Sequence, residues 1–379
     1  MRKILYLQYT NPAAFPPLEH SAQILSKNGW RVLFIGIRSS EIDNLRLNLQ
    51  DGIESRQLNY CPPGWRQKLH YIWFILYTCL TALCWRPKWV YASDPFSAIP
   101  TLLLSYWPTL KIIYHEHDSP TDEEASSFLR LIFAARKKLA RRADICILPN
   151  QTRAAVFAHE LSNGHTACVW NCPNREEAAW PKMEKNDGDL WLLYHGSIVP
   201  ARLPFSVLHA LQKLPEQVKL HIVGYETIGH RGYVQRLRET AIELGLSERV
   251  KFVGSVPTRK ELLELCQKSD IGMAFMPKCS EDINMKNMTG ASNKPFDYLA
   301  CGLALLVSDL PDWRKFFVGP GYALACDMEN SESIAAAVRW YLEHPLEMRR
   351  MGEGGRQRII LEWNYENQFR PILERINDK

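Results

Sequence analysis

Residues 292–307 read SNKPFDYLACGLALLV, which has the form of a capped helix followed at once by an apolar strand. Asn293 is a good N-cap, a glycine ends the helix, and Ala304–Val307 supplies the strand. Lys294 falls in the first turn, where the helix dipole disfavours a cation, so its position suggests an anionic partner. Asp297 lies one turn further on, where an acidic side chain is suited to bind the ribose hydroxyls of a nucleotide. The alternative is an ordinary capped helix with solvated charges, and both interpretations predict a helix–strand unit of an α/β sheet.

Short apolar runs alternate with segments of helical period on both sides of this stretch, as in parallel sheets covered by helices. The strands predicted in the second half are Leu190–Tyr194, Lys219–Val223, Val250–Val253, Ile271–Phe275, Ala304–Val307 and Tyr322–Ala325. Those predicted in the first half are Lys3–Leu7, Arg31–Ile37, Trp89–Ala92, Lys111–His115, Asp144–Leu148 and Thr166–Trp170. The polar segment 171–188 interrupts the pattern and predicts a linker. We therefore expect two α/β domains, with ligands bound in the loops that follow the strands.

The composition is that of a soluble globular protein, with 46% hydrophobic and 23% charged residues among 379. This length suits two domains. The net charge of +5 is compatible with an anionic ligand, but the sequence has no dense basic stripe, so we expect no nucleic-acid partner. The ten cysteines lack partners at zinc spacing, and the N-terminus lacks the pattern of a signal peptide. We expect reduced thiols, no metal and a cytoplasmic protein.

One segment, Tyr71–Trp85, carries no charge over 15 residues. A helix that spans the bilayer core needs about 20 apolar residues, so this segment is short for a span. It is either a helix buried in the protein or a helix partly immersed in a membrane face. The second interpretation is favoured by the flanking basic side chains Arg66, Lys68, Arg86 and Lys88. Residues 66–88 are therefore a candidate peripheral contact with the inner face of the cell membrane.

The strand ends of the second half carry small or turn-forming residues. Gly196 and Ser197 follow one strand, Arg202 stands near the start of the next helix, and Gly224 ends the following strand. Glycine lets the main chain approach a phosphate closely, a helix N-terminus offers free N–H groups, and arginine adds a bidentate clamp. Each feature alone is ordinary loop punctuation, but together they predict a groove for an anionic nucleotide.

Polar residues also follow the strands of the first half. The run HEHD at 115–118 places two histidines and two acids together, but neighbouring residues of an extended chain face opposite ways, so we expect no metal site. His117 is the candidate for contact with a donor or an acceptor. Asp94 is a second candidate, with helix capping as its structural alternative. Glu19 and His20 are the third, with ordinary first-turn helix polarity as theirs.

Four segments of the second half carry a resemblance to a known family: GSIVPAR (196–202), HIVG (221–224), KFVGSVP (251–257) and NKPFDYLACGLALLVSD (293–309). In order and spacing they resemble the donor domain of retaining GT-B glycosyltransferases, in particular glycosyltransferase family four. The first half fits less specifically, through YASDPFSAIP (91–100) and IIYHEHD (112–118). The resemblance implies two Rossmann-like domains that face each other across a cleft, with a C-terminal helix that crosses back to the first domain.

The polar break and the resemblance together set the expected domain boundaries. Residues 1–172 form the acceptor domain and residues 173–188 the linker. Residues 189–358 form the donor-nucleotide domain, and residues 359–379 form the C-terminal helix that packs on the first domain.

The resemblance implies roles for individual residues. The donor-binding residues are Gly196, Ser197, Gly224, Val256, Pro257 and Asp297. The first two line the diphosphate, Val256 and Pro257 flank the base, and Asp297 binds the ribose hydroxyls. The residues assigned to catalysis are Arg202 and Lys294, which neutralise the diphosphate, and His117, which faces the transferred sugar near its anomeric carbon.

Two positions depart from the family's pattern. Ser197 stands where the family commonly has an arginine, so neutralisation of the diphosphate rests on the two other cations. Gly290, seven positions before the ribose carboxylate, stands where the family has an acid that meets the donor sugar. Glu281 and Asp282 in the preceding loop are candidates to replace it.

The resemblance implies transfer of a sugar from a nucleotide-diphosphate sugar, with UDP as the first choice, to a hydroxyl of a glycan or lipid-linked glycan in cell-surface polysaccharide or glycoconjugate synthesis. The leaving diphosphate accepts the acceptor's proton and the anomeric configuration is retained, so positioning and charge carry catalysis, without a metal or a further cofactor. Three alternatives stay open: a sugar-nucleotide 2-epimerase, a pyridoxal-phosphate-dependent phosphorylase, and a non-catalytic GT-B partner subunit. Ser197 and Gly290 favour the last of these.

Overall fold

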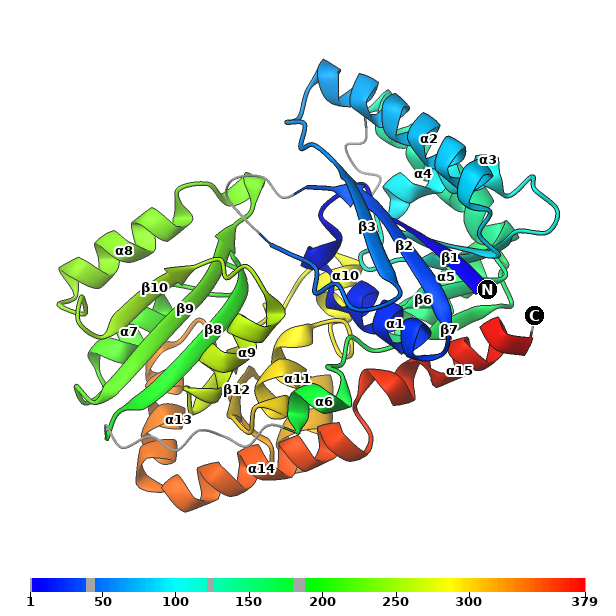
Figure 1. Ribbon diagram of the computed structural model, residues 1–379. Helices are drawn as coiled ribbons and strands as arrows, with labels where there is room; N and C mark the ends of the chain where they lie inside the picture. The colour runs from blue at the N-terminus through cyan, green and yellow to red at the C-terminus, as the bar shows by residue number, and fades with distance from the viewer. Residues whose placement is uncertain (1, 39–44, 121–125, 180–187, 379) are drawn as a thin grey trace.

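The computed structural model describes residues 2–38, 45–120, 126–179 and 188–378, which form two parallel sheets covered by helices (Figure 1). In spatial order, the strands of the first sheet are β3 (Ile53–Leu58), β2 (Trp30–Ile37), β1 (Arg2–Leu7), β4 (Trp89–Ser93), β5 (Lys111–His115), β6 (Ile145–Leu148) and β7 (Thr166–Cys168). Those of the second are β10 (Val250–Gly254), β9 (Val218–Glu226), β8 (Leu190–Ile198), β11 (Ile271–Ala274), β12 (Ala304–Ser308) and β13 (Ala323–Cys326). The prediction of two Rossmann-like α/β domains is confirmed.

Helices connect the strands and cover both sheets. The first domain contains η1 (Pro12–Ala14), α1 (Pro16–Lys27), α2 (Trp65–Trp85), η2 (Pro95–Ser97), α3 (Ala98–Leu104), α4 (Ser127–Arg142) and α5 (Gln151–Leu161). The second contains α7 (Ser206–Gln212), η3 (Ile228–His230), α8 (Tyr233–Glu243), α9 (Arg259–Gln267), α10 (Ile283–Lys286), α11 (Asn293–Ala300), α12 (Pro311–Trp313), η4 (Arg314–Val318), α13 (Ser331–Glu343) and α14 (Pro345–Leu361). The short α6 (Arg175–Ala178) lies in the predicted linker, of which residues 180–187 are outside the described part of the chain.

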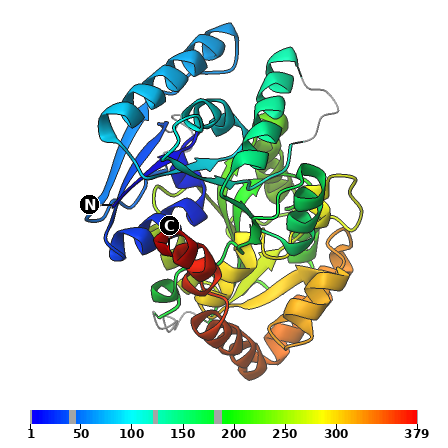
Figure 2. The same cartoon turned by 90° about the vertical axis from the view of Figure 1, so that its right-hand side faces the viewer.

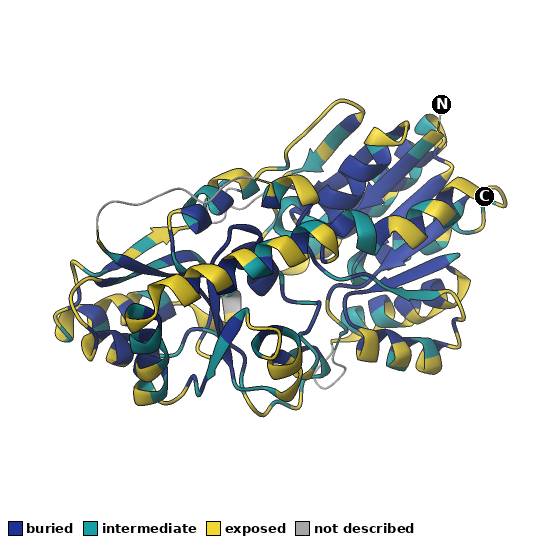
Figure 3. Ribbon diagram, turned by 90° about the horizontal axis from the view of Figure 1, so that it is seen from below, coloured by how far each residue is buried: buried dark blue, intermediate teal, exposed yellow. Residues whose placement is uncertain are grey.

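The core of each domain is the sheet itself. All residues of β4 and β12 are buried, because helices cover both faces of a parallel sheet. Figure 3 shows the central strands in the buried colour, beneath helices whose outer faces are exposed. Strand β3 was not predicted, since four of the six residues in its sequence IESRQL are polar and only its first residue is buried. β3 lies at the edge of the sheet, where a strand has only one neighbouring strand and its side chains need not all be buried.

The C-terminal helix α15 (Tyr365–Asp378) crosses back to the first domain (Figure 2). Its buried residues Tyr365, Phe369, Ile372 and Ile376 pack with the core side chains of β1 and β2. The crossing begins later than the predicted residue 359, because Ile359 still packs in the core of the second domain as part of α14. A single chain end therefore ties the two domains together.

The apolar segment within 66–88 forms helix α2. Its side chains Tyr71, Phe74 and Ala82 are buried in the first domain, so the prediction of a buried helix holds for one face. No helix among the described residues has both the length and the apolar character that a bilayer span requires.

Candidate active site

A cavity of about 150 Å³ lies between the two domains, at the carboxyl ends of β8, β9 and β10. Ligands of parallel sheets bind beyond these ends, so this is the candidate site. Six of the predicted residues line the cavity, namely Glu19, Gly196, Gly224, Val256, Pro257 and Asp297. The first domain also contributes η1, the start of α1 and the segment 45–46. The structure thus brings together residues that are far apart in the sequence.

The wall at β8 and β9 is bare main chain. Gly196 and Gly224 are paired across the two strands and have φ angles of +105° and +141°, which favour glycine. A Cβ on Gly224 would lie 1.8 Å from the carbonyl oxygen of Gly196, so no other residue fits there. A Cβ on Gly196 would lie 3.1 Å from the Lys294 ammonium. A ligand can therefore approach the main chain and a cation at the same place.

Two cations meet beside Gly196. Lys294 is buried in the first turn of α11, with 7% of its surface exposed. Burial and the nearby Arg202 guanidinium lower the pKa of the Lys294 ammonium to about 7, although Asp297 opposes this effect. Arg202 donates a hydrogen bond to the Ser197 hydroxyl (3.0 Å). No carboxylate of the described residues lies within ion-pair distance of Lys294 or Arg202, so an anion bound there would relieve their mutual repulsion.

Asp297 lines the same cavity and is 1% exposed. Its Oδ1 accepts a hydrogen bond from Arg259 (2.6 Å), and its Oδ2 lies 3.5 Å from Nε2 of His195. Burial raises the pKa of Asp297 against the effect of Arg259, and burial lowers the pKa of His195 well below its usual range. Asp297 Oδ2 and His195 Nε2 have no hydrogen-bond partner within the described part of the chain, so both can serve hydroxyl groups of a ligand.

Arg259, the first residue of α9, is a cavity residue that the sequence analysis missed. Its guanidinium donates a hydrogen bond to Asp297 and two to the carboxylate of Glu177 in α6, the latter at 2.5 and 3.0 Å. Burial would raise the pKa of Glu177, but Arg259 and His20 outweigh burial and hold the pKa well below its usual range. The sequence signal that could have identified Arg259 is a cation in the first turn of a helix, as at Lys294. Arg259 leaves only one oxygen of Asp297 for a ligand.

The predicted base-binding residues lie at the rim between the domains. Val256 and Pro257 line the cavity, and the carbonyl oxygen of Pro257 accepts a hydrogen bond from the Arg46 main chain (2.8 Å). Leu45 lines the cavity beside Arg46. A planar base between these segments would contact both domains.

His117 and Asp94 lie together at the ends of β5 and β4. The His117 main chain donates a hydrogen bond to the Asp94 carboxylate (3.0 Å), and the His117 ring lies 4.7 Å from Phe15, which adjoins the cavity-lining Pro16. Burial, aided by Arg153, lowers the pKa of His117 to about 3, so the imidazole is neutral. Asp94 has a positive φ of 62°, a strained conformation of the kind that clusters at functional sites, and burial raises its pKa to about 7.

The structure separates the other acidic and histidine candidates. Glu19 lines the cavity, and burial raises its pKa. His20 instead points to Glu177, with 3.2 Å between Nε2 and the carboxylate, and its ring lies against Tyr365. His20 thus belongs to the contact between α1, α6 and the crossing helix.

The two candidates for the missing sugar carboxylate lie outside the cavity lining. Glu281 is fully exposed and pairs with Lys286 at 3.1 Å. Asp282 caps α10 by accepting hydrogen bonds from Asn284. Gly290 has a φ of +81°, and a Cβ there would lie 2.4 Å from the Trp170 ring, so this backbone excludes a carboxylate at position 290.

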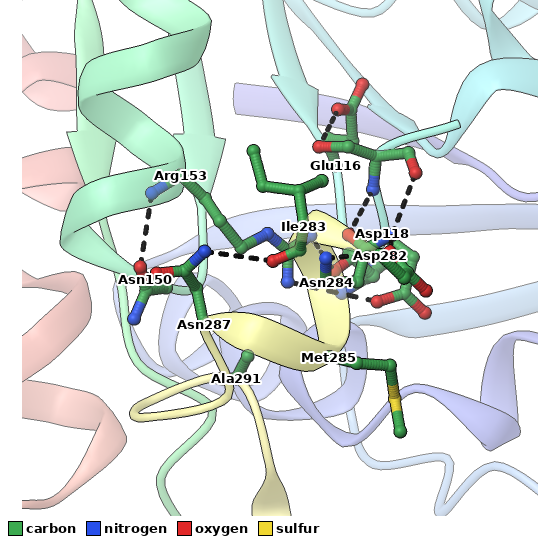
Figure 4. A network of polar contacts seen from close by, with 12 residues as sticks. Glu116, Asp118, Asn150, Arg153, Asp282, Ile283, Asn284, Met285, Asn287 and Ala291 are labelled. Carbon is green, nitrogen blue, oxygen red and sulfur yellow. Dashed lines mark hydrogen bonds and ion pairs between the residues drawn. The ribbon is translucent and has the colours of Figure 1, made fainter. Parts of the chain in front are cut away.

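Amide side chains hold the loop around Gly290 against the first domain (Figure 4). Asn284 donates to the carbonyl of Ser119 and accepts from its N–H, at 2.9 and 2.8 Å. Asn150 donates to the carbonyl of Thr289, and the Asn171 side chain donates to that of Ala291, both at 2.7 Å. These bonds set the separation of the two cleft walls.

No group of three or more histidine, cysteine or acidic side chains in the described ranges is arranged to hold a metal ion. The charges beside the main-chain wall are instead Lys294 and Arg202.

Comparison with known families and proteins gives matches over both domains. Residues 206–374, most of the second domain, match the family described as "Glycosyl transferase-like". Glycogen synthase of Mycobacterium tuberculosis is 22% identical over 289 residues, which are 74% of this chain and 66% of that protein. The aligned region thus spans just under two thirds of the relative's length.

Solved structures match the whole chain. Sucrose-phosphate synthase from Thermosynechococcus elongatus is 16% identical with a TM-score of 0.74, over 100% of this chain and 99% of the other. HepE of Anabaena, in a complex with UDP and glucose, is 17% identical with a TM-score of 0.75, over 100% of both chains. At these identities the likeness concerns the fold.

Proposed function

We propose that this chain, a glycosyltransferase of the GT-B fold, transfers a sugar from a UDP-sugar to an acceptor hydroxyl with retention of the anomeric configuration. The observation that carries the proposal is the pair of cations, Lys294 and Arg202, beside the bare main chain of Gly196 and Gly224. Lys294 is buried and Arg202 is half-buried, and cations shielded from water stabilise a diphosphate far more than they would in water.

The proposed function places the donor in the cavity in one orientation. The diphosphate lies against Gly196 and Ser197, and the ribose hydroxyls reach the unpartnered oxygen of Asp297 beside His195. The base lies between Val256–Pro257 and the segment 45–46. UDP is the first choice of nucleotide because HepE, a protein of the same fold, was solved with UDP and glucose.

Catalysis rests on charge and position. As the bond from the sugar to the diphosphate breaks, negative charge grows on the leaving phosphate, and Lys294 and Arg202 stabilise it in place of a divalent ion. The leaving phosphate oxygen takes the proton of the attacking acceptor hydroxyl on the same face of the sugar, so configuration is retained. The neutral His117 binds the sugar near its anomeric carbon, and Asp94 holds the His117 main chain.

The acceptor enters from the first domain. We place it among glycans or lipid-linked glycans at the cytoplasmic face of the cell membrane, and Glu19 is its candidate contact in the cleft. The apolar helix α2 with its basic flanks supports a lipid-linked acceptor.

The experiment measures UDP-sugar turnover and UDP binding in Lys294→Ala and Arg202→Ala. Each loses about 100-fold or more in turnover, as when one charge-stabilising group is removed from an active site. The matched control is Lys278→Ala, which removes an exposed lysine of the same domain and leaves turnover unchanged. Near-normal turnover in both cleft variants contradicts the phosphate assignment. EDTA leaves the wild-type rate unchanged if no divalent ion takes part.

Gly290 favours a second candidate, a non-catalytic GT-B partner subunit, because its backbone excludes the sugar carboxylate. A thermal-shift panel of UDP, GDP, ADP and their common sugars separates the two. Binding of none of these ligands supports the partner subunit, and binding with product formation supports the transferase. Product formed from the donor without an acceptor would instead indicate a 2-epimerase.

A further inference from the structure

Helix α2 exposes a broad apolar face. Seven of the sixteen large apolar side chains that are strongly exposed in the described part of the chain lie on this one helix: Trp65, Leu69, Ile72, Trp73, Leu76, Leu80 and Leu83. Each is 51–68% exposed. Soluble monomers rarely leave such a contiguous patch uncovered, so the patch indicates an interaction surface. We call these seven residues the α2 face.

The α2 face is a continuous stripe. Successive members are separated by four, three, one, three, four and three residues, which keeps them on one side of an α-helix. The opposite side is buried in the domain through Tyr71, Phe74 and Ala82. The neighbouring helix α3 and the residues after it add Leu103 and Tyr106, at 53% and 68% exposure (Figure 1).

The segment that carries the α2 face has charges of one sign. The sequence from Ser55 to Ser93 contains no Asp or Glu, while Arg66, Lys68, Arg86 and Lys88 flank the stripe and are exposed. A helix with an apolar face, basic flanks and tryptophans suits the interface of an anionic bilayer. This charge complementarity favours a lipid surface over a second copy of the chain, in which two basic faces would repel each other.

The α2 face begins beside the loops that follow β1 and β4. The Tyr9 hydroxyl bonds Nδ1 of His70 (2.9 Å) and donates to the carbonyl of Gln67 (3.3 Å), which ties the first turns of α2 to the loop after β1. Tyr71 donates to the carbonyl of Phe96, two residues after Asp94 (2.7 Å). The loops at the cleft edge of the first sheet are therefore fixed directly to the start of the stripe.

We propose that the α2 face binds the surface of an anionic phospholipid bilayer, with the helix lying in the interface plane and the rim of the cleft turned toward the lipid. A lipid-linked acceptor then reaches the cleft without leaving the bilayer. The acceptor part of this inference rests on the proposed function, but the binding to lipid does not.

The test is flotation of the full chain with vesicles of equimolar phosphatidylglycerol and phosphatidylcholine, and with vesicles of phosphatidylcholine alone. The wild type floats with the anionic vesicles. The variant Trp73→Ser/Leu76→Ser/Leu80→Ser has an affinity for these vesicles that is lower by about tenfold or more, because three interfacial side chains are lost. The matched control is Ile242→Ser/Leu346→Ser/Leu361→Ser, which removes three even more exposed apolar side chains of the second domain and floats like the wild type.

A second variant tests the charge. Arg66→Ser/Lys68→Ser/Arg86→Ser/Lys88→Ser loses the preference for anionic vesicles. No flotation of the wild type, or equal flotation of the α2-face variant, overturns the proposal. A wild-type dimer that the α2-face variant converts to monomer also overturns it, because a second copy would then cover the face. Thermal unfolding of the wild type and all variants is measured with and without UDP. The melting temperature without UDP reports the fold, and its shift with UDP reports the donor site. A wild type that floats but does not bind UDP counts against the proposed function alone.

Discussion

The two walls of the cleft differ in charge. The second-domain wall carries Lys294 and Arg202 beside bare main chain, and the pKa of Lys294 is lowered to about 7 by burial and by Arg202. The first-domain wall carries, beyond the residues that line the cavity, a neutral imidazole at His117 and a half-buried carboxyl at Asp94 whose pKa is raised to about 7. The second-domain wall is suited to an anion. In the proposed function, the diphosphate meets that wall and the transferred sugar meets His117 of the first domain.

The largest expected effect tests the bare main-chain wall. Gly224→Ala destabilises the protein by about 3 kcal/mol or more and abolishes UDP binding, because the new Cβ would overlap the Gly196 carbonyl. Thermal unfolding and UDP titration measure both effects. The control Gly232→Ala also sits at positive φ but faces open space, so it costs only about 1 kcal/mol and leaves UDP binding intact. Equal costs at the two positions would contradict the close contact of β8 and β9.

Next in size is the loss of the ribose contact on the second wall. Asp297→Asn weakens UDP binding by about 30-fold, the cost of one hydrogen bond to a charged group. Calorimetric titration measures this change. Glu261→Gln, a surface carboxylate change on α9, serves as the control and leaves the affinity unchanged. Unchanged affinity in Asp297→Asn would place the ribose elsewhere.

A smaller effect follows from the lowered pKa of Lys294. The free ammonium loses its proton near pH 7, and a bound diphosphate favours the charged form, so binding takes up a proton above pH 7. The affinity for UDP-glucose therefore falls with rising pH, by at most about tenfold per unit. Lys294→Arg stays charged over this range and flattens the profile. A flat wild-type profile would show that Lys294 does not meet the diphosphate.

The smallest effect concerns the first wall. His117→Ala lowers the turnover number by about tenfold through loss of one neutral hydrogen bond to the sugar, while the affinity for UDP stays unchanged. Steady-state kinetics and UDP titration on the same protein separate the two quantities. A parallel loss of UDP affinity would mean that His117 contacts the nucleotide and not only the sugar, and the contrast between the walls would fail.

Sequence reasoning found most of the second wall and less of the first. The motif around Lys294 and Asp297 is local, since first-turn charge and glycine stop belong to one helix. The predicted cap was wrong by one residue, because Ser292 stands at the N-cap and Asn293 is the first helical residue. Arg259 escaped notice because its partners Asp297 and Glu177 come from other elements. The edge strand β3 was missed because a mainly polar strand lacks the apolar run by which buried strands are recognised.

The sequence by itself determined the alternation of strands and helices and the two α/β domains, and it predicted the run of donor-binding segments. These follow from hydrophobic period and local backbone preference, which act between near neighbours in the chain. Only the tertiary structure decided that Arg202 comes close enough to Lys294 to lower its pKa, that Arg259 occupies one oxygen of Asp297, and that Trp170 excludes a side chain at Gly290. The physical reason is that strand order in the sheets brings together residues whose attraction, repulsion or overlap has no trace in local pattern.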